Sequence, residues 1–206
     1  MIENIIFDLG DVFVNLDHKK FQEELNYLGL KDITSNLIGF NQLYEKGLVS
    51  TKDFKAYYKN VLQKGGFSEE ELVNSWVSIL GDFPLHRLLF LERIPKKYRL
   101  FLLSNTNELH IDHVQTKFGN GFYDRFVNCF DKIYYSHEIN MRKPDADPFQ
   151  LIVSENKLSP SATLFVDDTL ENIEMAIHLG IQTWHINPEK DDVSELFDVK
   201  SDQFSI

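Results

Sequence analysis

The chain of 206 residues has little cysteine, few basic residues and no long apolar run. A single cysteine, Cys129, excludes an intrachain disulfide and a cysteine-ligated metal cluster. Its 21 basic residues against 32 acidic ones give a formal charge of −11, which argues against nucleic acid and anionic membranes as partners because both need basic patches. No segment approaches the ~18 apolar residues of a membrane span, and the N-terminus lacks the basic start of a signal peptide. These absences predict a soluble cytoplasmic protein and still allow a small anionic ligand.

What the chain does have is a series of short apolar runs that alternate with helical patterns. Such runs, bounded by turn residues, are typical of strands buried on both faces. The five runs are Ile5–Phe7, Arg99–Leu103, Ile133–Tyr135, Thr163–Val166 and Gln182–Ile186. Because strands alternate with helices, the sequence predicts an α/β fold with a doubly wound parallel sheet.

A long helical stretch interrupts this alternation between the first two runs. Its apolar residues recur at helical spacing, and Ser68 with Glu71 forms a capping-box pattern. The stretch of about seventy residues is far longer than a crossover between neighbouring strands needs. We therefore predict a helical cap subdomain at residues 15–83, inserted into an α/β core formed by residues 1–14 and 84–206.

Polar residues follow the predicted strands and would meet at one edge of the sheet, where ligands collect in open α/β folds. These residues are Asp8, Ser104, Lys143, Asp167 and Asp168. Three carboxylates on one edge repel each other unless a cation joins them, and Mg²⁺ with oxygen ligands is the natural partner. A lysine and a hydroxyl at the same edge suit phosphate oxygens. Asn172 follows Asp168 by four residues and is predicted to orient Asp168 or Lys143.

A carboxylate held beside a metal-bound phosphate can attack phosphorus and form an aspartyl-phosphate. The metal and the lysine offset the repulsion between the two anions. The edge residues therefore favour phosphoryl chemistry on a small substrate.

Four motifs, in chain order, resemble those of the haloacid dehalogenase-like (HAD-like) superfamily. They are Asp8–Val12, Leu103–Asn107, Met141–Asp145, and Phe165–Asp168 with Asn172. The insertion after the first motif resembles the small helical cap of this family, and the core would be its Rossmannoid sheet. The second and third motifs look closest to the bacterial α-D-glucose-1-phosphate phosphatase-like branch.

This resemblance implies a magnesium-dependent phosphomonoester hydrolase that acts on a small phosphorylated metabolite, a sugar phosphate, through an aspartyl-phosphate on Asp8. The implied metal ligands are Asp8, the carbonyl of Gly10, Asp168, and Asp167 directly or through water. The implied phosphate ligands are Ser104, Asn105 and Lys143, of which Lys143 is also catalytic. The sequence leaves the physiological substrate and the oligomeric state open.

The chain departs from the family pattern at Gly10, where most phosphatases of the family carry a second Asp as acid and base. That role is commonly worth ~10²–10⁴-fold in rate. Three explanations stay open: Asp11 substitutes for it, another group from the cap or water does, or the substrate has a good leaving group such as an anomeric sugar oxygen. His18, early in the cap, is a further residue that could face substrate.

Other functions also stay open. A haloacid dehalogenase uses Asp attack without metal, but the pair Asp167-Asp168 counts against it. A phosphomutase is disfavoured because its chemistry relies on the missing acid–base Asp. A regulatory module that binds phosphate or metal without turnover is the non-enzymatic alternative. At the cap tip, Glu45 and Lys46 either shape specificity or form an exposed ion pair.

Overall fold

The centre of the molecule is a five-stranded sheet in which every neighbouring pair is parallel. This is a computed structural model, and it describes residues 1–30, 34–62 and 66–204. The strand order is β3-β2-β1-β4-β5. The strands are β1 (Asn4–Phe7), β2 (Arg99–Ser104), β3 (Lys132–Tyr135), β4 (Thr163–Asp167) and β5 (Gln182–His185). The predicted doubly wound parallel sheet is therefore confirmed.

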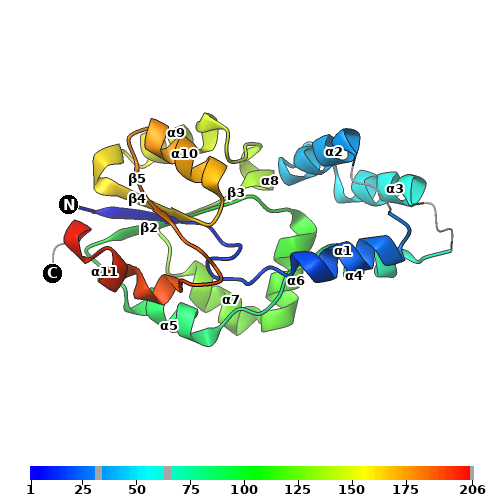
Figure 1. Ribbon diagram of the computed structural model, residues 1–206, viewed down its shortest axis with the longest axis horizontal. Helices are drawn as coiled ribbons and strands as arrows, with labels where there is room; N and C mark the ends of the chain where they lie inside the picture. Colours follow the sequence, from blue (N-terminus) through cyan, green and yellow to red (C-terminus); the bar gives the residue numbers. More distant parts are fainter. Residues whose placement is uncertain (31–33, 63–65, 205–206) are drawn as a thin grey trace.

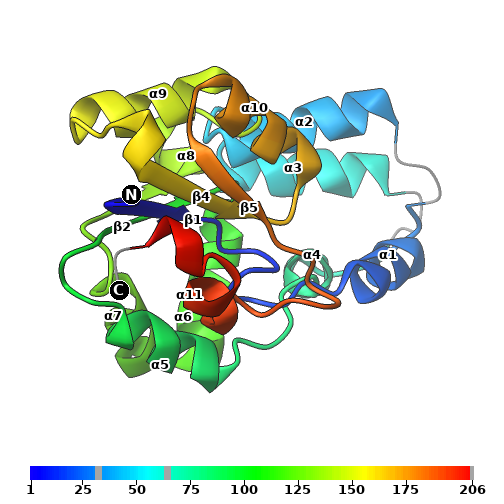
Figure 2. The same cartoon turned by 60° about the vertical axis from the view of Figure 1, so that its left-hand side comes forward.

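Helices cover both faces of this sheet (Figures 1 and 2). One face carries α9 (Ala146–Glu155) and α10 (Leu170–His178). The other carries α5 (Leu85–Arg93), α6 (Glu108–Phe118), α7 (Asn120–Val127) and the short α11 (Leu196–Val199). Alternate residues of β1 serve the two layers: Ile6 belongs to the apolar cluster that includes Phe149 of α9, whereas Ile5 and Phe7 belong to the cluster of the opposite face. Burial on both sides explains why Ile5–Phe7 of β1 form an unbroken apolar run.

Four further helices stand to one side of the sheet (Figure 1). They are α1 (His18–Tyr27), α2 (Ser35–Glu45), α3 (Thr51–Val61) and α4 (Glu69–Val77), here called the cap helices. Ser50 and Ser68 accept backbone hydrogen bonds at the starts of α3 and α4, and the predicted capping box of Ser68 with Glu71 is present. An aromatic cluster around Trp76, Phe54 and Tyr58 joins α3 to α4, with the Phe54 and Trp76 rings 4.6 Å apart. The predicted domain boundaries stay a prediction.

The two linkers between the cap helices and the sheet run side by side. The Asn15 N–H donates to the Asp82 carbonyl and the Gly81 N–H donates to the Asn15 carbonyl, both at 2.8 Å. A Cβ on Gly81 would come within 2.7 Å of the Asn15 carbonyl oxygen, so this close pairing requires glycine. These hydrogen bonds hold the two linkers together, so the cap helices are joined to the core by two paired segments of chain.

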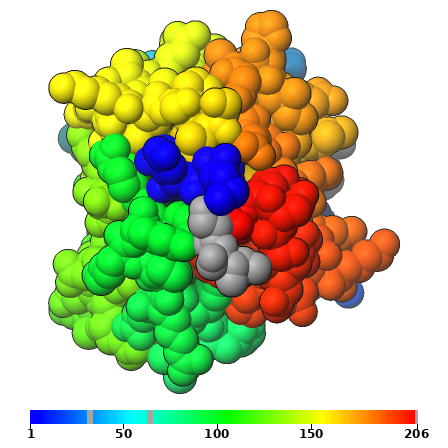
Figure 3. All heavy atoms as spheres, turned by 90° about the vertical axis from the view of Figure 1, so that its left-hand side faces the viewer, coloured from blue at the N-terminus to red at the C-terminus, as the bar shows by residue number. Residues whose placement is uncertain are grey.

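The polar composition of residues 137–145 predicts a loop, which is wrong at its start, because Ser136–Ile139 form α8 directly after β3. The aromatic stretch at residues 122–130 gives no clear pattern in the sequence. In the structure most of it belongs to α7 (Asn120–Val127), in which Phe122 and Phe126 lie four residues apart and both pack on Phe83. The two ends of the described chain meet away from the cap helices (Figure 3), where the Ile2 N–H donates to the Gln203 carbonyl at 3.0 Å. No helix in the described ranges has the length and apolarity to cross a membrane.

Candidate active site

Strand register brings the first group of predicted residues together. Asp8 directly follows β1, and its N–H donates to Val166 of β4 at 2.9 Å. Phe7 lies between Leu102 of β2 and Val166 of β4. One or two residues further along, the three strands therefore present Asp8, Ser104 and Asp167 at the same edge of the sheet.

Lys143 brings a positively charged side chain to this edge of the sheet. Its side chain is 1% exposed, and its Nζ lies 2.7 Å from Asp8 Oδ1 and 2.6 Å from Asp167 Oδ2. The Asn105 side chain holds the backbone of Lys143, because its Oδ1 accepts from the Lys143 N–H and its Nδ2 donates to the Lys143 carbonyl, both at 2.9 Å. The amide of Asn105 thus positions the lysine, and its role in substrate binding stays a prediction.

Asp167 is the most tightly held carboxylate of the group. It is fully buried, and it accepts hydrogen bonds from the Thr169 N–H at 2.8 Å and from Asn172 Nδ2 at 2.9 and 3.1 Å. The predicted partners of Asn172, Asp168 or Lys143, were therefore wrong: the first turn of α10 folds back over the end of β4 and aims the amide at Asp167. Both oxygens of Asp167 are occupied by protein donors.

Three carboxylates form a cluster that suits a hard cation. Oxygens of Asp8, Asp167 and Asp168 all lie within 4.8 Å of one another. Burial raises the pKa of Asp8 to about 7, with a further contribution from Asp167, although Lys143 opposes the rise. Burial and the neighbouring Asp167 also raise the pKa of Asp168. Because a bound cation would relieve this repulsion, and all donors are carboxylate oxygens, the residues fit Mg²⁺.

Asp11 lies near this cluster but is engaged elsewhere. Its backbone has a φ of +52°. Its Oδ1 accepts from the Leu16 N–H at 2.8 Å, and its Oδ2 lies 3.7 Å from Nε2 of the largely exposed His18. Its charge nevertheless contributes to the raised pKa of Asp168, so it stands within electrostatic range of the site. At Gly10, one residue earlier, an added Cβ would lie 2.9 Å from the δ-methyl of Leu16, a side chain that can move.

A serine directly after a strand and before a helix also suggests a helix N-cap at Ser104, but this interpretation is wrong. Asn107 is the N-cap of α6, and its side chain accepts from the His110 N–H at 3.1 Å. Ser104 is instead the last residue of β2 and is buried. The segment after it is fastened by Ser136, whose hydroxyl accepts from the Thr106 N–H and donates to the Thr106 carbonyl, both at 2.9 Å.

Two residues near the site escaped the sequence analysis. His185 Nε2 lies 2.8 Å from the Asp168 carbonyl oxygen and fixes the backbone there. His185 could have been predicted to lie near the site, because it belongs to the fifth predicted strand. In the structure it ends β5 in register with Asp167. Arg142 was included in a motif without a role, although it reaches the cap helices through Glu45 at 3.0 Å.

Comparison with known proteins agrees with this geometry. A family model described as haloacid dehalogenase-like hydrolase matches residues 2–180. The chain therefore belongs to the haloacid dehalogenase-like hydrolase family, as the four motifs predicted.

Relatives in this family include enzymes of known activity. The chain is 29% identical over 189 residues to the D-ribitol-5-phosphate phosphatase of Bacteroides thetaiotaomicron, covering 89% of this chain and 91% of that protein. A wild-type HAD-family enzyme of the same organism, solved with magnesium and inorganic phosphate, is 31% identical with a TM-score of 0.78, covering 96% of this chain and 100% of that one. A predicted HAD-like hydrolase from Porphyromonas gingivalis has a TM-score of 0.85 at 24% identity, covering 97% of this chain and 98% of that one, which supports the fold.

Proposed function

We propose that the protein is a magnesium-dependent phosphatase that cleaves small sugar or alditol phosphates through a phosphate ester on Asp8. The observation that carries the proposal is the contact of Lys143 with both Asp8 and Asp167 inside a three-carboxylate cluster. A buried lysine between carboxylates, with serine at the same edge, matches the needs of an anionic phosphate beside an anionic nucleophile.

The metal would be held by Asp8 and Asp168, with the Gly10 carbonyl as the further ligand implied by the family resemblance. Because Asp167 already accepts from Lys143, Asn172 and the Thr169 N–H, we assign it to orient the site and to contact the metal through water. When bound, Mg²⁺ supplies positive charge that offsets the repulsion between nucleophile and phosphate.

The first chemical step forms a bond between a carboxylate oxygen of Asp8 and phosphorus, and it breaks the bond between phosphorus and the alcohol oxygen. Lys143 and Ser104 hold the phosphoryl oxygens. In the second step, water attacks phosphorus, which releases inorganic phosphate and regenerates the carboxylate of Asp8. Lys143 keeps Asp8 aimed by its 2.7 Å contact throughout.

The departing alcohol needs a proton, and Gly10 supplies none. Asp11 is the nearest substitute on this segment, but one of its oxygens accepts from the Leu16 N–H. To serve as the acid, Asp11 would use its other oxygen, which faces His18. We therefore expect Asp11 to matter for alkyl phosphates and to matter little for aryl phosphates, whose leaving groups need less assistance.

The substrate class is supported by one relative, a D-ribitol-5-phosphate phosphatase, whose name gives a phosphorylated polyol as its substrate. A cavity of about 510 Å³ lies between the cap helices and the core, but none of the proposed catalytic, metal or phosphate residues lines it. Two of its polar side chains, Thr51 and Glu108, are hydrogen-bonded to each other, so this cavity does not support the choice of substrate.

The test measures phosphate release from an aryl phosphate, D-ribitol 5-phosphate, glucose 1-phosphate and glucose 6-phosphate, with and without Mg²⁺. We expect activity that requires both Mg²⁺ and Asp8 and that is lost in Asp8→Asn. A clear preference for the 5- or 6-phosphate over the 1-phosphate would reject the anomeric explanation for Gly10. Binding of Mg²⁺ and phosphate without turnover of any ester, seen as a rise in melting temperature, would replace the phosphatase by the regulatory module.

A further inference from the structure

The tip of the cap helices touches the loop that carries Lys143. We call residues Glu45–Gly47, at the end of α2, the cap tip, and residues Asn140–Asp145 the lysine loop. The two segments are about a hundred positions apart in the chain, yet two ion pairs and a hydrogen bond from a side chain to a backbone carbonyl join them.

The ion pairs cross from one segment to the other. Glu45 Oε2 lies 3.0 Å from Arg142 Nε, and Lys46 Nζ lies 2.8 Å from Asp145 Oδ2. The sequence suggested that Glu45 and Lys46 pair with each other or face substrate, but each instead has a partner on the lysine loop. The first pair is the better protected, with side chains 27% and 20% exposed, so solvent screens it less than a surface pair. Burial raises the pKa of Glu45, and the Arg142 guanidinium beside it offsets part of that rise.

The backbones also approach closely at this contact. Asn140 Nδ2 donates to the Lys46 carbonyl at 2.7 Å. Gly47 has a φ of +65°, and a Cβ there would come within 2.1 Å of the His137 carbonyl oxygen. Only glycine fits, so the cap tip is shaped to seat against this part of the core.

The lysine loop is therefore held from two sides. On the core side, the Asn105 amide bonds both backbone groups of Lys143. On the cap side, the residues just before and two after Lys143 are paired with Glu45 and Lys46. Movement of the cap helices away from the core would break the cap-side anchors and leave those from Asn105.

We propose that the Glu45–Arg142 pair couples closure of the cap helices to the placement of Lys143 between Asp8 and Asp167. Glu45 and Arg142 are thus positioning residues, which act through Lys143. The inference rests on the proposed function, because it assigns a purpose to cap closure in that reaction. It restricts the fully aligned lysine to the closed state, when the substrate is shielded from water.

The test compares steady-state hydrolysis of an aryl phosphate with Mg²⁺ by Glu45→Gln, Arg142→Gln and the charge-swapped double variant Glu45→Arg/Arg142→Glu. We expect each single variant to lower kcat about fivefold, the factor that corresponds to ~1 kcal/mol of coupling in a partly exposed pair, with little change in KM. We expect the swapped variant to recover most of this loss.

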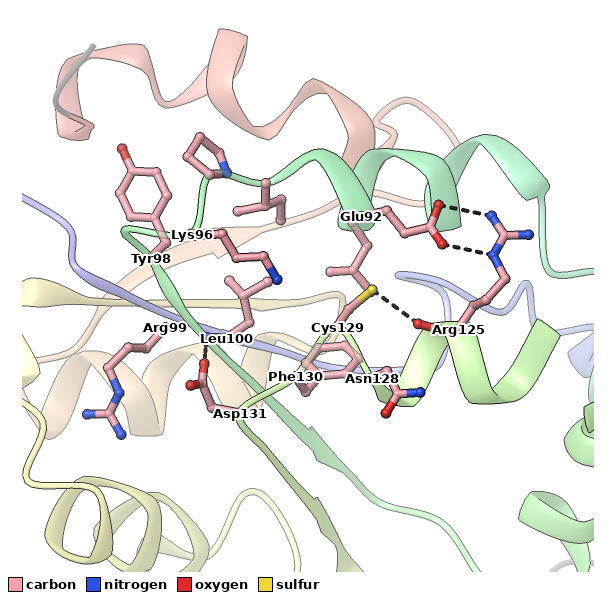
Figure 4. A pocket seen from close by; sticks show the side chains of 13 residues that line it. Glu92, Lys96, Tyr98, Arg99, Leu100, Arg125, Asn128, Cys129, Phe130 and Asp131 are labelled. Carbon is pink, nitrogen blue, oxygen red and sulfur yellow. Dashed lines mark hydrogen bonds and ion pairs between the residues drawn. The ribbon is translucent and has the colours of Figure 1, made fainter. Parts of the chain in front are cut away.

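A matched control pair lies at the opposite end of the sheet. Arg125 and Glu92 form a two-bond ion pair on the wall of a cavity near the start of β2 (Figure 4), with distances of 2.8 and 2.9 Å. Because this pair is far from the site, Arg125→Gln should leave kcat unchanged within about twofold. Hydrogen exchange supplies a second readout, in which Glu45→Gln should speed exchange of amides in the lysine loop and Arg125→Gln should not.

The outcomes separate the inference from the proposed function. A wild-type chain that hydrolyses no phosphate ester rejects the proposed function, and the exchange of the lysine loop then decides the coupling alone. An active wild type with unchanged kcat in both single variants overturns the inference. Loss in Arg142→Gln but not in Glu45→Gln, without recovery in the swapped variant, also overturns it, because Arg142 would then act on substrate directly.

Discussion

Replacement of Lys143 by methionine tests how much the lysine ammonium stabilises the fold beside the two carboxylates Asp8 and Asp167. Methionine keeps an unbranched apolar chain but removes the ammonium that lies 2.7 Å from Asp8 and 2.6 Å from Asp167. The side chain is 1% exposed, so water cannot replace the lost charge. Removing one partner of a buried ion pair is destabilising by roughly 3–5 kcal/mol. We expect Lys143→Met to lose about that much at neutral pH, a large part of the ~5–15 kcal/mol that holds a typical domain.

The loss should depend on pH in a defined direction. The pKa of Asp8 is already raised to about 7 with Lys143 present, and it rises further without the ammonium. A carboxyl with a raised pKa keeps its proton in the folded state, so the fold is favoured at low pH and loses that advantage as the pH rises through the folded pKa. The deficit of Lys143→Met against wild type should therefore be small near pH 5 and full near pH 8.

Urea unfolding at pH 5, 6.5 and 8 measures this deficit, with Lys132→Met as the control. Lys132 pairs with Glu155 at the surface, where both side chains are more than 40% exposed, so its loss should change stability little at any pH. Added Mg²⁺ should stabilise Lys143→Met more than wild type, since it neutralises the same carboxylates. An equal deficit at pH 5 and pH 8 would refute the reasoning, because it would assign the loss to packing.

Three further predictions concern proton supply and the junction between cap and core. Gly10→Asp should raise hydrolysis of alkyl phosphates by about tenfold or more, since the new Cβ would meet the movable side chain of Leu16 and no backbone atom, and unchanged kinetics would show that another group already serves as acid. Asp11→Asn should slow alkyl phosphates but not aryl phosphates, and equal slowing of both would assign Asp11 to local structure. His110, stacked on Trp76, has its pKa lowered to about 4 by burial, so the fold should lose stability as the pH falls from about 6.5 to about 4. His110→Phe should reduce the loss of stability between pH 7 and pH 4.5 by about 2 kcal/mol, a value that allows for solvent screening at the partly exposed edge of the His110 ring. Thermal unfolding of both proteins at pH 4.5 and pH 7 measures this difference.

Much of the sheet could be predicted because its strands are buried on both faces. Burial on both sides forces unbroken apolar runs such as Ile5–Phe7, and parallel strands align their carboxyl ends, so Asp8 and Asp167 had to share one edge. The residue types at this edge then predict a cation site, because clustered carboxylates repel each other unless a cation lies between them.

The partners of individual side chains could not be predicted, because they depend on distances that spacing along one helix does not determine. Asn172 shows this: helical spacing pointed to Asp168, but the turn after β4 brings its amide to Asp167. Glu45 and Lys46 show it more strongly, because their partners lie about a hundred residues away on the lysine loop. Only the docking of the cap tip on the core brings these charges together.

The central claim is that Asp8 itself receives the phosphoryl group. The direct measurement is to quench the enzyme during turnover of an aryl phosphate with Mg²⁺, reduce it with borohydride, and locate the modified residue by peptide mass spectrometry. Borohydride converts an acyl phosphate to an alcohol, so the account predicts homoserine at position 8, dependent on substrate and absent in Asp8→Asn. Turnover with an unmodified Asp8, or with the label on another residue, would contradict it.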